Sequence, residues 1–583
     1  MDEKMVNLKI NGLAVQARAG STILEAARRV NIEIPTLCHL KGINEIGACR
    51  ICVVEVKNAK SLVPACVYPV SEGMEVKTNT LKVQKSRRMT LELILSDHRK
   101  DCVNCVRSKN CELQNLSNDL GVDFLRFGKH EKEPMPESST VHLIRDNSKC
   151  ILCRRCIAMC GAVQGVSVLA PVERGFRTKV STAFDKKLSD VPCVKCGQCI
   201  AVCPTGALTD KEYTQEVWEA LEDPDKHVVI GTAPSARATL GECFGMPIGT
   251  NVEGKMVAAL RRLGFDGVFD VDTAADLTIM EEGTELLERL EKGGPFPLIT
   301  SCSPGWIGFA EYFYPEFLPN ISSCKSPQQM FGAIMKTYYA KKKGIDPKDI
   351  FVVTVMPCTA KKYEITRSGQ SAAGSGIPDV DVALTTREIS RMITRAGIDF
   401  VNLPKEDFDS AFGEASGAAH IFGATGGVME AALRTVAEIL TGKPLERPEF
   451  HEVRGTKNIK EAEYDIAGKK IRVAVTSGLA NARKLLDRIK NGEAEYHFVE
   501  IMGCPGGCVN GGGQPIQPGP VRGFTDLRSL RAKALYDEDR GMTLRKSHEN
   551  ETIKKLYEEF LEKPGSHKAH EILHTTYQPR SRY

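Results

Sequence analysis

Short apolar runs recur through the second half of the chain, separated by stretches of helical periodicity. The runs cover residues 228–230, 297–299, 350–353, 380–384, 471–475 and 497–501. Alternation of buried strands with helices is typical of α/β layers with largely parallel strands. In open α/β sheets, ligands bind beyond the carboxyl ends of the strands. Residues just after these runs are therefore the first candidates for a functional site, and they include Cys302, Cys358 and Cys504.

The N-terminal pattern has a period of two instead. Apolar and polar residues alternate on both sides of Asn11-Gly12, a strong signal for a two-residue β-hairpin. Thr22 and Glu25 then form a capping box, which predicts a helix from about residue 23. Four cysteines follow in the spacing C-x10-C-x2-C with a distant fourth member, at Cys38, Cys49, Cys52 and Cys66. The pattern resembles a [2Fe–2S] ferredoxin and predicts a β-grasp domain over residues 1–80; four unrelated buried cysteines are the plain alternative.

Composition changes this picture mainly through cysteine. The chain has 583 residues, too many for a single core, and 21 cysteines, of which 15 precede residue 204 in four groups. In a long chain with short regular spacings, such groups indicate metal sites rather than disulfides. The net charge of +4 without a dense basic tract argues against nucleic-acid binding. No apolar run reaches the ~20 residues of a membrane helix, so we expect a soluble, cytoplasmic protein without membrane or nucleic-acid partners.

The second cysteine group follows a helical stretch from Leu81 to Ser96. It consists of His98, Cys102, Cys105 and Cys111. Three cysteines and one histidine are also a common structural zinc set, so the spacing alone leaves zinc open. The group stands between two iron–sulfur patterns, where an isolated zinc would interrupt a chain of electron carriers. We therefore favour a [4Fe–4S] cluster with His98 as a ligand, in a domain over residues 81–130.

The third and fourth groups carry the most specific metal signal of the first half. Each has the spacing C-x2-C-x2-C-x3-C, at Cys150, Cys153, Cys156 and Cys160 and at Cys193, Cys196, Cys199 and Cys203. Two such runs are typical of bacterial two-cluster ferredoxins, in which the fourth cysteine of each run binds the other cluster. We expect one [4Fe–4S] cluster on Cys150, Cys153, Cys156 and Cys203, and another on Cys193, Cys196, Cys199 and Cys160. The domain is expected over residues 140–211, after a polar linker at 131–139.

Motifs in the second half resemble those of [FeFe]-hydrogenases. The stretch from Met356 to Glu364 follows the pattern MPCxxKxxE, and the stretch from Cys504 to Gln514 follows CxxxCxxGGGQ. The stretch from Thr300 to Trp306 resembles the family's first motif, TSCCPxW. The cysteine groups of the first half stand in the order of multi-cluster catalytic subunits, so the resemblance spans essentially the whole chain. It implies an α/β catalytic domain over residues 212–520 and a C-terminal wrapping segment over 521–583.

The resemblance implies reversible reduction of protons to H2 at an H-cluster, which is a [4Fe–4S] cubane bridged by one cysteine to a two-iron unit with CO, cyanide and a dithiolate. Carried over by motif, Cys358 and Cys504 hold the cubane and Cys508 is the bridge. Lys361 and the turn with Pro234 and Ser235 would donate hydrogen bonds to the diatomic ligands, which need such donors when buried. A solvated surface lysine is the alternative for Lys361. One [2Fe–2S] cluster and three accessory [4Fe–4S] clusters complete the expected cofactors.

The chain departs from the family in the first motif, where Ser303 replaces the second cysteine. In the family, the first of the two cysteines passes protons to the two-iron unit and the second binds the cubane. Three outcomes are open: Cys302 binds the cubane, Ser303 binds it through oxygen, or one iron keeps a labile site. A serine alkoxide is a harder and more basic donor than a thiolate. We therefore prefer Cys302 as the ligand, with Ser301, Ser303 or an ordered water passing protons.

The remaining proton path resembles the family's relay of carboxylates, serine and arginine. Glu282, Glu285 and Arg289 lie on the helical stretch 277–290, and Ser322 follows the first motif. Glu282 and Glu285 stand three positions apart, so they share one helix face and can pass a proton along it. Exposed helix carboxylates are the plain alternative.

The electron partners are expected to be other proteins. The sequence holds no dinucleotide-binding motif, so flavin and NAD(P) are expected on partner subunits, as in NAD(P)-linked multimeric hydrogenases, with ferredoxin as the other electron partner. H2 and protons are the expected substrates, and maturation proteins the expected source of the H-cluster. Two other classes stay open. Ser303 allows a sensory or low-activity hydrogenase, and the first half is shared with the large iron–sulfur subunit of NADH dehydrogenases. Iron–sulfur assembly proteins that resemble hydrogenases lack the β-grasp front and fit less well.

Overall fold

The N-terminal part of the chain is a five-stranded sheet with one helix. The computed structural model describes residues 4–124, 126–127, 136–410 and 413–582. The strands have the order β2-β1-β5-β3-β4 and, with the helix, are β1 (Met5–Ile10), β2 (Leu13–Arg18), β3 (Val53–Val56), β4 (Val63–Pro64), β5 (Glu75–Lys77) and α1 (Ile23–Arg29). Ile10 pairs with Leu13, which confirms the hairpin at Asn11-Gly12. The Thr22 and Glu25 side chains make both bonds of the predicted capping box. The β-grasp prediction is confirmed.

Two helices and a small two-layer unit follow. The predicted helix at residues 81–96 is α2 (Leu81–Ser96), and α3 (Glu112–Asp119) begins directly after Cys111. The next unit has two antiparallel strand pairs and two short helices, namely β6 (Leu143–Arg145) with β9 (Leu208–Asp210), β7 (Ala170–Val172) with β8 (Lys179–Ser181), α4 (Arg155–Ala158) and α5 (Gln198–Ala201). Of the predicted linker, residues 131–135 lie outside the described residues, and Glu137 pairs with Arg145.

The part of the chain that is predicted to be catalytic, residues 212–520, contains two four-stranded sheets and is called the catalytic part. The first is fully parallel, in the order β11 (Gly267–Asp270), β10 (His227–Thr232), β13 (Ile350–Met356) and β14 (Val382–Thr385). The second has the order β12 (Leu298–Ile299), β17 (Phe498–Met502), β16 (Lys469–Ser477) and β15 (Ile459–Ile466). Only β15 runs antiparallel to its neighbour in these two sheets as described. Every predicted apolar run is a strand, whereas β11 and β15 were not predicted.

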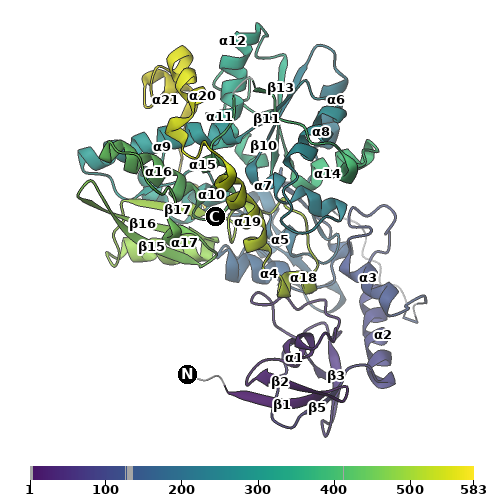
Figure 1. Cartoon of the computed structure of the whole chain (residues 1–583). Coiled ribbons are helices and arrows are strands. Elements are labelled where there is room, and N and C mark those ends of the chain that lie inside the picture. The colour runs from purple at the N-terminus through teal and green to yellow at the C-terminus, as the bar shows by residue number, and fades with distance from the viewer. Residues whose placement is uncertain (1–3, 125, 128–135, 411–412, 583) are drawn as a thin grey trace.

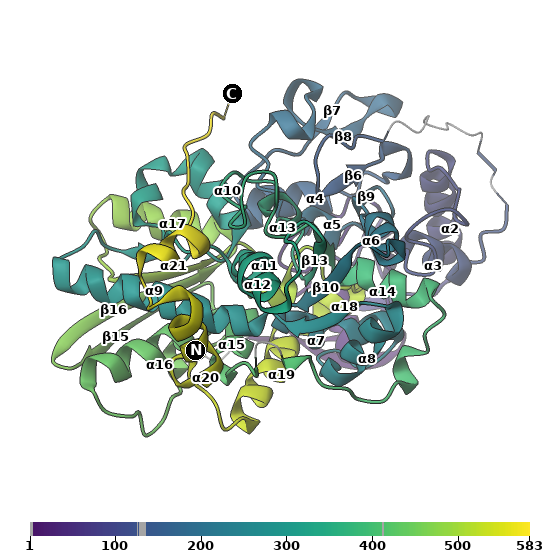
Figure 2. The ribbon, with the colours of Figure 1, turned by 90° about the horizontal axis from the view of Figure 1, so that it is seen from above.

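Helices cover both faces of these sheets, as the view from above shows (Figure 2). The helices of this part are α6 (Thr214–Glu222), α7 (Pro234–Arg237), α8 (Glu253–Leu263), α9 (Asp272–Lys292), α10 (Pro304–Phe313), α11 (Pro327–Ile334), α12 (Ala340–Lys343), α13 (Lys361–Glu364), α14 (Thr386–Arg395), α15 (Gly417–His420), α16 (Gly427–Thr441) and α17 (Leu479–Lys490). One apolar core joins α8 and α14 to the parallel sheet, and another joins α9 and α16 to the second sheet. The helix predicted at 277–290 lies within α9.

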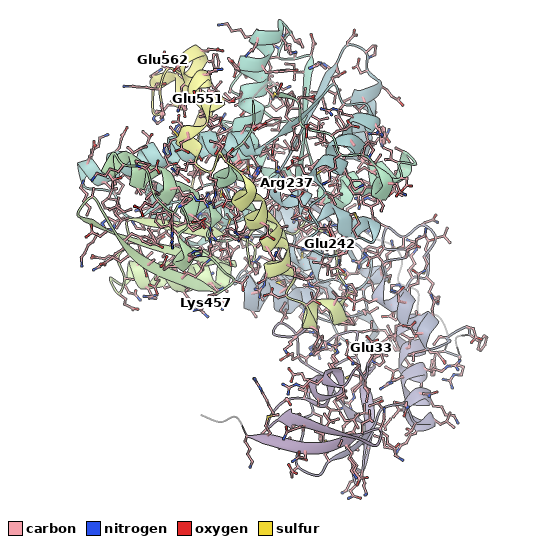
Figure 3. The ribbon with its side chains drawn as sticks, in the orientation of Figure 1. Glu33, Arg237, Glu242, Lys457, Glu551 and Glu562 are labelled. Carbon is pink, nitrogen blue, oxygen red and sulfur yellow. The ribbon has the colours of Figure 1, made fainter. Side chains whose placement is uncertain are left out.

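The C-terminal residues wrap around the outside of the catalytic part (yellow in Figure 1). They form α18 (Gly519–Phe524), α19 (Leu527–Gly541), α20 (Glu551–Leu556) and α21 (His567–Leu573). Arg531 of α19 makes a bidentate ion pair with Glu242, which Figure 3 shows beside this helix. The N-terminal sheet lies at the opposite end of the molecule from α12 and α21 (Figure 1). None of the described helices is both long and apolar enough to cross a membrane.

Candidate functional site

Three cysteines meet beyond the carboxyl ends of strands from both catalytic sheets. Cys504 follows β17 and Cys358 follows β13, so the crevice lies between the two sheets. The thiols of Cys358 and Cys504 are hydrogen-bonded, which lowers the pKa of Cys358 and raises that of Cys504. Burial, followed by the charge of Cys358, raises the pKa of Cys508. Soft sulfur donors gathered in this way suit iron–sulfur groups.

Glycines let the backbone of the Cys504 loop lie directly against the backbone of neighbouring segments. A Cβ atom on Gly511 would lie 2.2 Å from the Pro357 carbonyl oxygen. On Gly507, which has a φ of +92°, it would lie 2.6 Å from the Thr425 nitrogen. No side chain fits at either position. The glycines therefore hold Cys508 close to the Cys358 strand end.

The same loop also packs against the unit of residues 140–211, which is predicted to bind two clusters and is called the two-cluster unit. A Cβ atom on Gly512 would lie 2.2 Å from the Cys196 carbonyl oxygen, and one on Gly197 would lie 2.2 Å from Thr359 Oγ1. Gln198 donates to the Asn510 carbonyl at 2.8 Å. The Cys196 segment thus lies directly behind both the Cys358 and the Cys504 loops. An electron carrier bound there would be the neighbour of the catalytic crevice.

Replacing Gly512 by alanine is expected to destabilise this contact by about 1–3 kcal/mol, as overpacking does. The backbone of Gly512 does not have a positive φ, so the effect is steric: the new methyl would meet backbone atoms of Cys196 and Gly197. Thermal unfolding of the protein measures it. Gly541→Ala is the matched control, since a Cβ there meets nothing within 4 Å. Equal melting temperatures of the two variants would contradict the packing argument.

The eight cysteines of the two-cluster unit line two separate small cavities. One is lined by Cys160, Cys193, Cys196 and Cys199, and the other by Cys150, Cys153, Cys156 and Cys203. In each set the fourth member comes from the other run of the sequence. These are the sets that the crossed ferredoxin pattern predicts, and they fit one four-iron cluster each.

The His98 group, which consists of His98, Cys102, Cys105 and Cys111, lies against the two-cluster unit. His98 is 7% exposed, and burial lowers its pKa to about 4, so the ring is neutral. Its Nδ1 atom is buried and has no hydrogen-bond partner. A neutral imidazole with one free nitrogen suits a metal ligand. A Cβ on Gly206 would lie 2.7 Å from Cys105 Sγ, so the group contacts the segment between Cys203 and the start of β9.

The four N-terminal cysteines form two close thiol pairs. The sulfur atoms of Cys52 and Cys66 lie 3.3 Å apart, and the Cys49 backbone N–H donates to Cys38 Sγ at 3.4 Å. The hydrogen bond from Cys38 lowers the pKa of Cys49 to about 6. A metal group that binds thiolates readily displaces the protons of thiols that are paired in this way. The set fits a two-iron cluster.

Lys361 is buried beside the crevice rather than solvated. It is 8% exposed, and its ammonium group donates to Ser326 Oγ at 2.7 Å, Glu364 at 2.8 Å and the Cys302 carbonyl at 3.2 Å. Glu364, the last residue of its motif, thus fixes the lysine and balances its charge. The surface alternative for Lys361 is excluded.

Cys302 and Ser303 face different sides of the crevice. Ser303 Oγ accepts the Gly503 backbone N–H at 3.0 Å, next to Cys504. Burial, followed by the charge of Glu282 and then that of Cys508, raises the pKa of Cys302. Cys302 therefore lies toward Glu282 and Cys508, and Ser303 lies toward Cys504. This arrangement favours the assignment opposite to our sequence preference for Cys302 as the cubane ligand.

The residues that are predicted to pass protons form one line of hydrogen-bonded side chains that runs inward from the surface of α9. Arg289 donates to Glu285 at 2.7 Å, and Ser322 Oγ donates to the other oxygen of Glu285 at 2.8 Å. Ser322 also hydrogen-bonds to Glu282, which is 1% exposed. Burial and the charge of Glu285 raise the pKa of Glu282 to about 8, so this carboxyl can hold a proton near neutral pH. The alternative of solvated helix carboxylates is excluded for Glu282.

Models of known families match five segments of the chain. Those described as iron only hydrogenase large subunit, C-terminal domain, and iron hydrogenase small subunit match residues 226–512 and 525–580. A 2Fe-2S iron-sulfur cluster binding domain, the NADH-ubiquinone oxidoreductase-G iron-sulfur binding region and a 4Fe-4S dicluster domain match residues 3–81, 87–126 and 122–207. The NADP-reducing hydrogenase subunit HndD of Solidesulfovibrio fructosivorans is 50% identical, with 99% of this chain and 100% of that protein covered. The chain belongs to the iron-only hydrogenase family.

Further relatives agree with this assignment. Iron hydrogenase 1 of Clostridium pasteurianum is 43% identical over 98% of this chain and 100% of its own length. A solved structure of apo [FeFe]-hydrogenase HydA1 from Chlamydomonas reinhardtii, a point variant, matches with a TM-score of 0.57 and 42% identity, covering 63% of this chain and 99% of that one. The predicted family and enzyme class are confirmed: this hydrogenase is an oxidoreductase that acts on H2 and uses iron–sulfur clusters.

In this hydrogenase, the turn after β10 lies beside Cys508. Gln514 Nε2 donates to the Cys508 carbonyl at 3.1 Å and to the Ser235 carbonyl at 3.4 Å. Ser235 Oγ is fully buried and has no hydrogen-bond partner. An orphaned buried hydroxyl is expensive unless a bound group accepts from it. Ser235 therefore fits the predicted donor side of a buried anionic group, and Pro234, which has no N–H to donate, lies beside it in the same turn.

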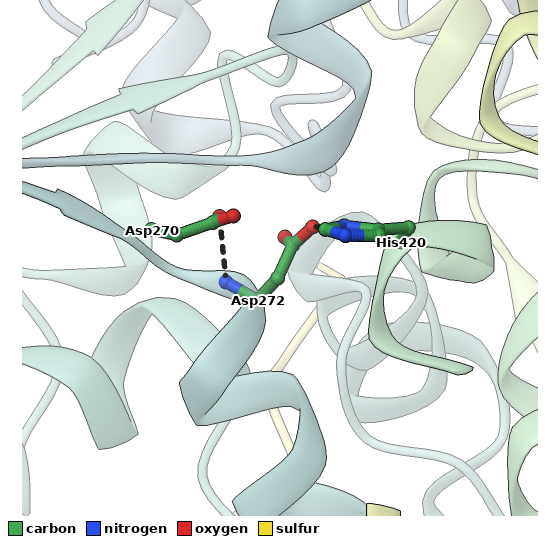
Figure 4. Close-up of side chains that lie close together, drawn as sticks. All are labelled: Asp270, Asp272 and His420. Atoms are coloured by element: carbon green, nitrogen blue, oxygen red, sulfur yellow. Dashed lines mark hydrogen bonds and ion pairs between the residues drawn. The ribbon is translucent and has the colours of Figure 1, made fainter. Parts of the chain in front are cut away.

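A cluster of Asp270, Asp272 and His420 behind α7 has the spacing of a metal site, with ligand atoms within 4.8 Å of one another (Figure 4). Arg237 already occupies it. Its guanidinium contacts Asp270 at 2.7 and 2.8 Å, Asp272 at 3.2 Å and His420 Nδ1 at 3.1 Å. Figure 3 places Arg237 inside the catalytic part. We interpret the cluster as a buried ion-pair network that fixes the turn carrying Ser235.

Several buried residues that connect the cluster sites were missed by sequence reasoning. Arg155 makes a bidentate pair with Glu112 and donates to the His39 carbonyl at 3.2 Å. Asn44 donates to carbonyls of two predicted cluster ligands. These side chains join segments far apart in the sequence. The only sequence signal for them is their place next to cysteine motifs.

Proposed function

We propose that this hydrogenase interconverts H2 with two protons and two electrons at an H-cluster, and exchanges the electrons with NAD(P) through partner subunits. The observation that carries the proposal is the convergence of Cys358, Cys504 and Cys508 on one crevice, beside buried Lys361 and the line that ends at Glu282. The NADP link is supported by a relative, named an NADP-reducing hydrogenase subunit, that matches over 99% of this chain and 100% of its own length. Ferredoxin stays the second proposed electron partner.

The proposed cofactors are one [2Fe–2S] cluster, three accessory [4Fe–4S] clusters and the H-cluster, which maturation proteins supply. The ligand sets of the accessory clusters are those predicted from the spacings. When bound, the H-cluster would supply the redox chemistry that forms or splits H2. Around it, Lys361 and Ser235 would donate hydrogen bonds, and Pro234 would help to exclude water. The domain boundaries predicted at residues 80, 130, 211 and 520 remain part of this proposal.

For the first motif we propose Cys302 as the proton-passing residue and Ser303 as the residue at the cubane corner. The support is the side that each residue faces, Cys302 toward Glu282 and Ser303 toward Cys504. The Cys302 thiol would give its proton to the crevice, and the thiolate left behind would take the proton held by Glu282. Ser322, Glu285 and Arg289 replace that proton from the surface.

Infrared spectroscopy of the anaerobically matured chain tests the proposal. Bands of metal-bound CO and cyanide are expected, together with H2-dependent reduction of a viologen dye. The chain alone is expected not to reduce NAD(P), since the nucleotide site is placed on a partner. Absence of the CO and cyanide bands in protein with full accessory clusters would rule out the H-cluster.

A sensory or low-activity hydrogenase is the second candidate, and Ser303 is the observation that favours it. An oxygen ligand or an open site at one cubane corner would change the electron affinity of that cubane. Dye-linked H2 oxidation by the wild type and by Ser303→Cys distinguishes the two. A much higher rate of H2 oxidation in Ser303→Cys would support a wild type of low activity. Similar rates in the two proteins would support a wild type that is efficient with serine in place.

A further inference from the structure

A tight turn in the N-terminal sheet domain presents Asn44 to a second domain. Leu40 and Asn44 exchange both backbone hydrogen bonds, at 3.0 and 2.8 Å, and Gly42 between them has a φ of +70°. This pairing turns the chain back on itself directly after Cys38. The Asn44 side chain is therefore directed back at the preceding loop, which carries Cys38, and Asn44 is 3% exposed.

The Asn44 amide bridges two predicted cluster ligands. Its nitrogen donates to the Cys38 carbonyl at 2.7 Å and to the Cys153 carbonyl at 3.0 Å. Cys38 belongs to the two-iron set, and Cys153 to a four-iron set more than a hundred residues later. Both N–H groups of one amide are thus used, one within the turn and one across the domain boundary. A residue needed only to shape the turn would not require the second bond.

Other contacts at this boundary are less direct. Leu40 packs with Met159 and Val202 in a small apolar cluster. Arg155 reaches the carbonyl of His39, which is not a predicted ligand. These contacts hold the two parts together and leave Asn44 as the described side chain that bonds to both ligand segments at once. In Figure 1 the N-terminal domain meets the rest of the chain below α4, the helix that begins at Arg155.

From this geometry we propose that Asn44 is the positioning residue for electron exchange between the [2Fe–2S] site and the Cys150, Cys153, Cys156 and Cys203 site. Electron tunnelling falls off steeply across empty space and less steeply through bonds. The path here runs from the Cys38 thiol through its own carbonyl, across the two hydrogen bonds of one amide, and into the peptide of Cys153. The inference rests on the proposed clusters and adds the residue that couples two of them.

The exchange moves one electron and no atoms. When H2 is oxidised, the four-iron site at Cys153 gives up one electron and is oxidised, and the two-iron site at Cys38 accepts that electron and is reduced. Asn44 neither gains nor loses a proton. It only holds the donor and acceptor segments at bonding distance.

Two measurements on the full chain with reconstituted accessory clusters test Asn44→Ala. Loss of the two hydrogen bonds is expected to raise the exchange rate of the backbone amides at residues 40–44 about tenfold, because local opening becomes easier. The electron-spin relaxation of the reduced two-iron cluster, which a nearby reduced four-iron cluster accelerates, is expected to slow. Neither measurement needs the two-iron unit of the H-cluster, so a failure here is distinct from a failure of the hydrogenase proposal.

Asn402→Ala is the matched control, since Asn402 is an exposed asparagine whose amide bonds only to nearby Asp399. It is expected to match the wild type in both measurements. If Asn44→Ala fails to retain its two-iron cluster, Asn44→Ser takes its place, because the hydroxyl keeps a donor for Cys38 without the reach to Cys153. Wild-type relaxation and exchange in a fully loaded Asn44 variant would overturn the proposal. In matured protein, slower reduction of the two-iron cluster by H2, with normal reduction of the Cys193 cluster, would support it.

Discussion

Cys302→Ala is expected to lower H2 turnover by about 10²–10⁴-fold while the infrared bands and the cubane signal of the H-cluster are retained. The reason is the side of the crevice that each residue faces: Cys302 lies toward Glu282 and Cys508, and Ser303 toward Cys504. Removal of the Cys302 thiol then breaks the proton line without removing a ligand. Dye-linked turnover together with infrared and EPR spectra of the same samples measures both effects.

Ser303→Ala is the paired variant. If Ser303 sits at the cubane corner, this change alters the cubane potential and leaves proton passage intact. The opposite pattern, in which Cys302→Ala destroys the cubane signal, would restore Cys302 as the ligand and show that a hydroxyl or water passes protons in its place.

Glu282→Gln is expected to lower turnover by a similar factor of about 10²–10⁴, because an amide cannot accept and release the proton. Glu288→Gln is the control on the same helix, since Glu288 is an exposed residue paired with Lys292. Wild-type turnover in Glu282→Gln would mean that protons reach the crevice by another path. Dye-linked assays between pH 6 and pH 9 would also show whether wild-type activity declines above about 8, where Glu282 loses its proton.

The same carboxyl affects stability in a predictable direction. Its pKa is about 8 in the folded protein and near the usual 4.5 when unfolded, so between these values the folded protein holds the extra proton. Stability contributed by this group therefore falls as the pH rises through that window. Glu282→Gln is expected to show a weaker decline in melting temperature from pH 5 to pH 8 than the wild type.

Local patterns were enough to predict most of the fold. The six apolar runs became strands, and α2 has the predicted bounds, because burial and helix periodicity leave a direct trace in the sequence. β15 was missed because it is an edge strand with mostly polar residues on its outer side. β11 was missed because it has only four residues and starts with Gly267. Short or edge strands depend on neighbours that the local sequence does not reveal.

The proposed iron–sulfur sites followed from the spacing of the cysteines, whereas the roles of adjacent residues did not. The two runs at residues 150–160 and 193–203 each predict three ligands of one proposed cluster by their spacing, and the fourth ligand comes from the other run. Cys302 and Ser303 are neighbours in sequence, and the groups that each one faces, Glu282 and Cys508 for Cys302 and Gly503 for Ser303, lie on other segments of the chain. Asn44 and the Arg237 network were not predictable, because their partners lie on elements far away in the chain.

The wrapping of the C-terminal residues has a consequence for synthesis. Leu573 accepts the Lys325 backbone N–H, and α20 packs on the apolar face shared by α9 and α11. During translation, α9 leaves the ribosome long before residues 551–573 exist. Its apolar face then stays uncovered, and a nascent chain in that state is prone to stick to others or to be held by chaperones. A stop codon placed before residue 551 should thus yield insoluble protein even though every cysteine motif is already complete.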